Sequence, residues 1–136
     1  MRIYIDSSWL LRVILQQDKV MPLPKNAVIF SSILLKVECL RVLDRQHKRK
    51  RLSDNEFTHL IQQLTSYTNL IELIELERSI VLRAAEPFLL PLATLDALHL
   101  ATALKVREIE GADIRFATFD DELALATIAY GFTVIN

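Results

Sequence analysis

Cysteine, glycine and an excess of either charge are nearly absent from this 136-residue chain. Cys39 is the only cysteine, which excludes an internal disulfide and a zinc cage built from cysteines. The formal net charge of −1 argues against a general polyanion binder, so contact with nucleic acid would need a local basic patch. No apolar stretch is long enough to span a bilayer, and Asp6 interrupts the N-terminal apolar run that a signal peptide would need. We therefore expect a soluble cytoplasmic protein without a membrane partner.

The composition that remains is typical of one globular domain, which we expect to span residues 1–136. Apolar residues make up 51% of the chain and charged residues 24%. Apolar runs predict short strands at 3–5, 27–30, 70–74, 114–117 and 132–135. Helical spacing predicts intervening helices capped at Ser7 or Ser8, at Ser31 and Ser32, and by a capping box from Ser53 to Glu56, followed by helices at 77–88, from Thr94, and at 122–130. A proline-containing loop is predicted at 19–25, and Gly131 is expected to end the last helix.

Strands that alternate with helices predict an α/β fold with a parallel sheet covered on both faces. Continuous apolar strands such as residues 27–30 agree, because a half-exposed strand would alternate polar and apolar residues. In such sheets, binding sites gather beyond the carboxyl ends of the strands. We therefore expect functional residues directly after the strands.

Four acidic residues lie where an apolar strand ends or a helix begins: Asp6, Glu38, Asp96 and Asp120. A charge beside an apolar run is costly unless it is paired, and no lysine or arginine stands near all four in the sequence. The natural counter-charge is a metal ion. Ligands that are all oxygen favour hard cations such as Mg²⁺ or Mn²⁺. Singly, each acid could instead be a helix cap; the set of four favours metal binding.

The segments around these acids resemble the PIN-domain nucleases, and most closely the VapC toxins of prokaryotic toxin–antitoxin pairs. The resemblance covers the whole chain and rests on residues 4–8 (Tyr-Ile-Asp-Ser-Ser), Ser31-Ser32 followed by Glu38, residues 95–103 and residues 117–124. It implies a three-layer α/β/α fold with a central five-stranded parallel sheet. It also implies a Mg²⁺- or Mn²⁺-dependent endoribonuclease that acts on RNA, binds a small VapB-type antitoxin and forms a homodimer.

The family's acids map onto Asp6, Glu38, Asp96 and Asp120. Thr118 matches a small hydroxyl residue two positions before the last acid, which favours Asp120 over its neighbour Asp121 as the site residue. We expect Asp6 to be the central ligand, with Asp96 and Asp120 as further ligands and Glu38 on a second ion or its water. Ser7 and Thr118 are expected to hydrogen-bond the carboxylates.

The single dense basic cluster comprises Arg45, His47 and the run Lys48, Arg49, Lys50 and Arg51. Cations at a helix end suit the negative end of the helix dipole, and this interpretation is slightly favoured. The alternative is an edge that contacts RNA phosphates. His99 lies one turn after Asp96, and we expect it to pack in the helix rather than bind metal.

The residues also bear on three other functions. A PIN-fold module that binds RNA or protein without cleaving it would have no use for the intact acid set. A nuclease acting on DNA remains open, because the acids contact only the phosphodiester. Phosphate-handling α/β enzymes fit poorly: a dehalogenase-type phosphatase needs an acid where Ser8 stands, and a receiver domain needs its aspartate after the third strand, where Glu72 lies inside the strand.

Overall fold

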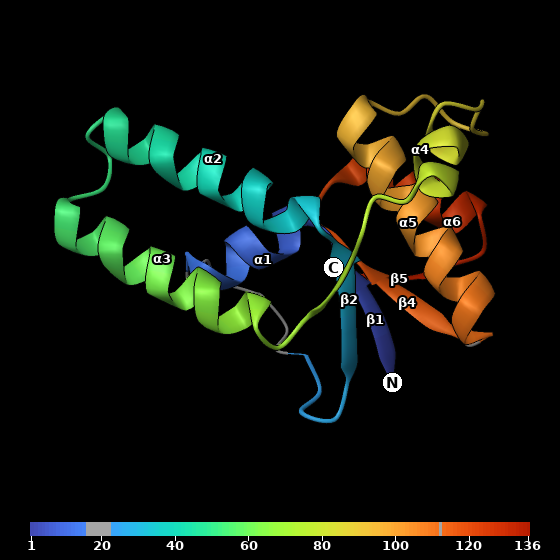
Figure 1. The fold of residues 1–136 in the computed structure, drawn as a ribbon, viewed down its shortest axis with the longest axis horizontal. Coiled ribbons are helices and arrows are strands. Elements are labelled where there is room, and N and C mark those ends of the chain that lie inside the picture. Colours follow the sequence, from blue (N-terminus) through green and yellow to red (C-terminus); the bar gives the residue numbers. More distant parts are fainter. Residues whose placement is uncertain (16–22, 112) are drawn as a thin grey trace.

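A parallel sheet forms the centre of the molecule in the computed structural model, which describes residues 1–15, 23–111 and 113–136 (Figure 1). Its strands run in the order β3-β2-β1-β4-β5, and every neighbouring pair is parallel. This confirms the predicted five-stranded parallel sheet. The strand bounds are β1 (Arg2–Ile5), β2 (Val28–Ser32), β3 (Glu72–Ile74), β4 (Ile114–Ala117) and β5 (Thr133–Ile135).

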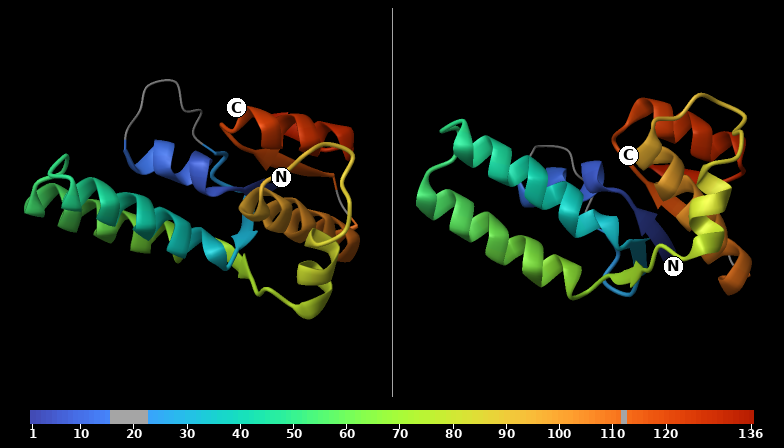
Figure 2. Two further views of the ribbon diagram at one scale, coloured as in Figure 1. Left: turned by 90° about the horizontal axis from the view of Figure 1, so that it is seen from above. Right: turned by 45° about the horizontal axis from the view of Figure 1, so that its top comes forward.

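Helices cover both faces of the sheet, so the predicted three-layer α/β/α architecture is also confirmed (Figures 1 and 2). One layer contains α1 (Ser7–Ile14), α2 (Leu34–Lys48) and α3 (Asp54–Thr68), and the other contains α4 (Arg78–Ala84), α5 (Thr94–Glu110) and α6 (Asp121–Ala129). Helices α2 and α3 form a long hairpin that extends well beyond the sheet (Figures 1 and 2).

The central strand β1 divides the core in two, because successive side chains of a strand point to opposite faces. Ile3 and Ile5 pack with Trp9 and other residues of α1, α2 and α3. Tyr4 points the other way and packs with Phe116 and with residues of α5 and α6. All three β1 side chains are buried, so the position of Asp6, the next residue along, is firmly determined.

The predicted caps of the first two helices were wrong. The side chain that caps α1 belongs to Asp6, whose Oδ1 accepts from the backbone N–H of Trp9 at 3.1 Å. Ser31 and Ser32 belong to β2 rather than to a helix cap, because that strand continues to pair with β3 up to Ser32. The Ser32 hydroxyl still accepts from the backbone N–H of Leu34 at 3.2 Å.

Other local predictions agree with the structure more closely. The capping box at Ser53 and Glu56 is present with both of its hydrogen bonds. Gly131, with a φ of +84°, follows α6 and ends it as expected. Helix α4 is shorter than the predicted 77–88 and ends at Ala84, before Pro87, because the residue preceding a proline avoids helical geometry. Of the predicted loop at 19–25, residues 19–22 lie outside the described part of the chain.

No helix in the described part of the chain combines the length and apolar character that crossing a bilayer requires.

Candidate functional site

Four of the secondary-structure elements bring acidic side chains to the same edge of the sheet. Asp6 directly follows β1, Asp120 lies between β4 and α6, Glu38 belongs to α2 and Asp96 lies in the first turn of α5. Because β1 and β4 are parallel neighbours, the residues after them meet at one edge. The backbone N–H of Asp6 donates to the carbonyl of Ala117, which joins the two strand ends directly.

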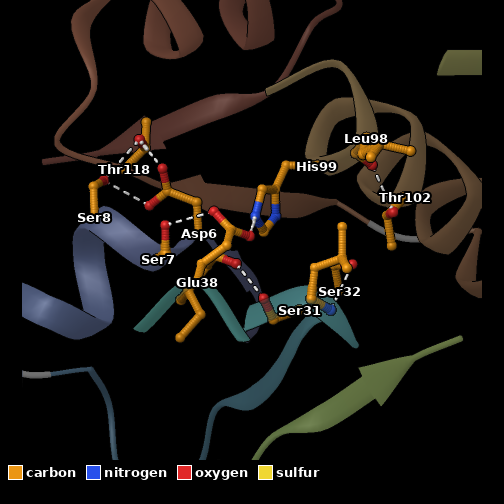
Figure 3. Close-up of polar contacts among 12 residues, drawn as sticks. Asp6, Ser7, Ser8, Ser31, Ser32, Glu38, Leu98, His99, Thr102 and Thr118 are labelled. Atoms are coloured by element: carbon orange, nitrogen blue, oxygen red, sulfur yellow. Dashed lines mark hydrogen bonds and ion pairs between the residues drawn. The ribbon is translucent and has the colours of Figure 1, made fainter. Parts of the chain in front are cut away.

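Asp6 is the most deeply held of the four acids, with a side chain that is nearly fully buried. Its Oδ1 accepts from the Ser8 hydroxyl at 2.7 Å and from the Trp9 backbone, and its Oδ2 accepts from the Thr118 hydroxyl at 2.7 Å (Figure 3). Burial raises the pKa of Asp6, and these hydrogen bonds oppose that rise. Oδ2 accepts one of these bonds, so one of its lone pairs remains for a further ligand.

Glu38 is held at both of its oxygens by residues from other elements. The Ser7 hydroxyl donates to Oε2 at 2.9 Å, and His99 Nε2 lies 2.6 Å from Oε1 (Figure 3). His99 is buried, and Glu38 is partly exposed. The structure thus places Ser7 against Glu38 and Thr118 against Asp6, so the two hydroxyl residues serve different carboxylates.

Asp96 and Asp120 are freer than the other two acids. The Oδ1 of Asp120 accepts from the Leu123 backbone at 2.8 Å and so caps α6. Neither the other Asp120 oxygen nor either Asp96 oxygen receives a hydrogen bond from the residues that the structure describes. Burial raises the pKa of Asp96 to about 6, and the negative charges of Asp120 and Asp6 add to this rise. Asp121, the alternative to Asp120, is exposed.

The chemistry of this set fits a hard divalent cation. Within residues 1–15, 23–111 and 113–136, no lysine or arginine forms an ion pair with Asp6, Glu38, Asp96 or Asp120, and Glu38 pairs with His99 alone. Burial raises the pKa of Asp96, and the neighbouring carboxylates of Asp120 and Asp6 add to that rise. Carboxylate oxygens are the ligands that Mg²⁺ and Mn²⁺ prefer. As they stand, however, no three such side chains among the described residues converge closely enough to hold an ion.

The predicted basic run lies apart from these acids. Lys48 ends α2, and Arg49, Lys50 and Arg51 form the turn into α3, at the tip of the hairpin that points away from the sheet (Figure 1). Ten residues of helix separate Glu38 from Lys48, a distance of about 15 Å. Lys48 also lies 3.5 Å from Asp44, which partly neutralises it. The structure therefore does not bring this cluster into the acidic site.

The sequence analysis did not predict the contacts that two residues make with the acids of the site. Ser8, expected only as a possible helix cap, donates to Asp6 and accepts from the backbone of Phe119 at 2.9 Å. His99 is buried, as expected, and it also contacts Glu38. A sequence signal existed for each: Ser8 lies two residues after the first acid, and His99 lies one helical turn after Asp96, on the same helix face.

Comparisons with known proteins agree with this architecture. The family model described as "PIN domain" matches residues 3–128. Among solved structures, VapBC-1 from nontypeable Haemophilus influenzae is 11% identical with a TM-score of 0.60, covering 100% of this chain and 98% of the other. VapC20 of Mycobacterium tuberculosis, a toxin that cleaves the sarcin–ricin loop, is 15% identical with a TM-score of 0.61, covering 96% of each chain. No curated protein matches the sequence.

Proposed function

This chain belongs to the PIN-domain family, and from that membership and its acidic site we propose that it is a metal-dependent endoribonuclease, the toxin of a toxin–antitoxin pair. PIN domains are typically metal-dependent nucleases, and the fold is similar to that of VapC toxins. The likeness to solved structures supports the fold, and the reaction is our inference from the site.

One observation supports a nuclease above all. A half-buried aspartate, Asp96, has a pKa raised to about 6 by burial and by the carboxylates of Asp120 and Asp6. Gathering acids that repel each other costs stability, and a protein gains nothing from this unless a cation binds there. A binding module without catalysis has no need of such a cluster.

Each acid has a distinct role in the proposed reaction. Asp6, through Oδ2, Asp96 and Asp120 would hold a Mg²⁺ or Mn²⁺ ion, and Glu38 would hold a second ion or its water. Such an ion supplies positive charge to the phosphate and lowers the pKa of a water molecule that attacks it. Ser8 and Thr118 orient Asp6 through their hydroxyl groups, so its carboxylate cannot rotate away from the site.

The test is an Asp6→Asn variant, assayed on RNA with Mg²⁺ or Mn²⁺ and with EDTA as the metal-free control. Asparagine keeps the size of the side chain and an oxygen that can accept from Ser8 and Trp9, so the fold should persist. We expect RNA cleavage to be lost in Asp6→Asn and retained in the matched Asp121→Asn variant, whose carboxylate is exposed. Cleavage by Asp6→Asn at the wild-type rate would refute the proposal, and parallel DNA substrates identify the nucleic acid that is cut.

The basic turn at the hairpin tip is proposed to contact RNA phosphates outside the site. Replacing residues 48–51 with serine should weaken RNA binding and flatten its dependence on salt, because each phosphate contact releases counterions. A double Arg2→Ser, Lys105→Ser variant removes cations away from the hairpin as a control. If the 48–51 substitutions leave RNA affinity at low salt unchanged, this part of the proposal is wrong.

The partner is proposed to be a small VapB-type antitoxin, on the basis of the similar VapBC complex. Exposed apolar side chains on α2 and α4, among them Val37, Val81 and Leu82, offer surface for such a contact. Expression of the chain alone should arrest growth, and expression of Asp6→Asn should not. Rescue by the product of a short neighbouring reading frame would identify the antitoxin.

A further inference from the structure

Behind Glu38 lies a buried chain of polar groups that the roles assigned above do not use. His99 Nε2 lies 2.6 Å from Glu38 Oε1, and the Tyr4 hydroxyl lies 2.9 Å from His99 Nδ1. Tyr4 and His99 are 0% and 1% exposed. Figure 3 shows the His99 ring directed at the Glu38 carboxylate. This series of hydrogen-bonded side chains thus connects the central strand β1, through α5, to α2.

The hydrogen positions follow from what each group can donate. An ionised carboxylate only accepts, so the hydrogen between His99 and Glu38 belongs to Nε2. A neutral ring then has Nδ1 as an acceptor, and the Tyr4 hydroxyl supplies the hydrogen it needs. Burial raises the pKa of Tyr4 well above its ordinary value of 10, so this hydroxyl keeps its hydrogen. One tautomer of His99 satisfies both neighbours.

This arrangement excludes two simpler roles for His99. Both ring nitrogens are occupied, by Tyr4 and by Glu38, so neither is available to bind a metal ion. Filling space alone is also a poor explanation, because a buried imidazole needs a partner for each nitrogen and an aliphatic side chain does not. The polar ring is useful at this position because it donates to Glu38.

We propose that His99, with Tyr4 behind it, is a positioning residue that holds the Glu38 carboxylate ready for a divalent cation. The inference rests on the proposed function, in which Glu38 takes part in metal binding. The Ser7 hydroxyl holds the other Glu38 oxygen, so each oxygen is left with one lone pair. Loss of a residue that orients a metal-binding carboxylate typically costs about 10- to 100-fold in metal affinity.

The experiment measures Mn²⁺ affinity by titration calorimetry, separately from RNA cleavage. His99→Leu removes the donor, and His99→Gln retains an N–H that can reach Glu38. Thr127→Val is the control: it removes a buried hydroxyl, on α6, that bonds the carbonyl of Ala124 rather than a site residue. We expect His99→Leu to lose about 10- to 100-fold in Mn²⁺ affinity, His99→Gln to regain most of that loss, and Thr127→Val to bind like the wild type.

A second readout tests the tautomer itself. In NMR of the ¹⁵N-labelled histidine rings, the ring whose signal disappears in His99→Gln should carry hydrogen on Nε2. If circular dichroism shows that His99→Leu does not fold, Tyr4→Phe is tested instead. This variant removes only the hydroxyl that sets the tautomer of His99, and it too should weaken Mn²⁺ binding.

The outcomes separate this inference from the proposed function. If the wild-type protein binds Mn²⁺ and folded His99→Leu binds it equally well, the positioning role alone is overturned. If His99→Leu does not fold, equal Mn²⁺ binding by Tyr4→Phe has the same meaning. A His99 ring with its single hydrogen on Nδ1, which leaves Nε2 unable to donate to Glu38, also overturns the positioning role. Wild-type protein that binds no Mn²⁺ overturns both, since Glu38 would then have no ion to bind.

Discussion

Replacing Asp96 with asparagine should stabilise the metal-free protein at neutral pH while greatly weakening its stabilisation by metal. Asp96 is ionised at pH 7 although burial and the charges of Asp120 and Asp6 raise its pKa to about 6. Asparagine has nearly the same shape and no charge. No described residue donates a hydrogen bond to Asp96, so the substitution breaks none of those that the structure records.

The sign of the pH dependence follows from proton binding. The pKa of Asp96 rises from an ordinary value of 3.8 in the unfolded chain to about 6 in the folded protein. Between these values the folded state binds more protons than the unfolded state, so stability falls as the pH rises from about 4 through 6. As the pH falls below 3.8 the carboxyl group becomes neutral in both states, so the difference in stability between wild type and variant should disappear there.

The expected gain in stability depends on the size of the pKa change and on the exposure of the Asp96 side chain. A change in pKa from 3.8 to about 6 corresponds to about 3 kcal/mol. Asp96 is only half-buried, and water screens part of the repulsion, so about 1 to 2 kcal/mol is expected for Asp96→Asn at pH 7. For a chain of this length, that is a rise in the midpoint of thermal unfolding of about 3 to 10 °C.

The assay is thermal and urea unfolding, followed by circular dichroism between pH 4 and pH 7.5 with EDTA present. Adding Mn²⁺ at 100 times its dissociation constant should then stabilise wild type by about 2.7 kcal/mol and Asp96→Asn far less. Asp121→Asn serves as the control, since the Asp121 side chain is exposed beside the same helix start. Identical pH profiles for wild type and Asp96→Asn would show that the acids do not repel one another as described.

Two further predictions concern the hairpin tip and are measured by urea unfolding. Lys50 has a φ of +57°, which strains any residue with a side chain, so Lys50→Gly should stabilise the fold by about 0.5 to 1 kcal/mol. Lys50→Ala keeps the strain and should give no such gain; equal stability of the two variants would contradict the argument. Ser53→Ala removes the side-chain bond to the Glu56 backbone that caps α3 and should cost about 1 kcal/mol. An unchanged unfolding midpoint would show that the cap contributes nothing.

Several elements follow from short stretches of sequence, because their causes are local. The pattern of Ser53 and Glu56 specifies a capping box, and Gly131 can adopt the positive φ that ends α6. The apolar run at 114–117 became β4 with those bounds. Alternation of such strands with helices was enough to predict a parallel sheet covered on both faces, and acids just beyond its strands.

Contacts between distant segments decided the rest. Pairing with β3 makes Ser31 and Ser32 part of β2, and the two serines themselves do not predict a strand. The burial that raises the pKa of Asp96, and the neighbouring acids that add to it, exist only once α5 packs on the face of the sheet that carries Tyr4 and Phe116.

Apolar spacing and helix caps act over a few residues, so the amino-acid sequence alone predicts the kinds of element and the α/β class. Tertiary structure alone decided which hydroxyl holds which carboxylate, that His99 meets Glu38 across 61 positions, and that the basic turn lies far from the acids. Hydrogen bonds and charge repulsion depend on distances through space, and the folded packing of the helices on the sheet sets those distances.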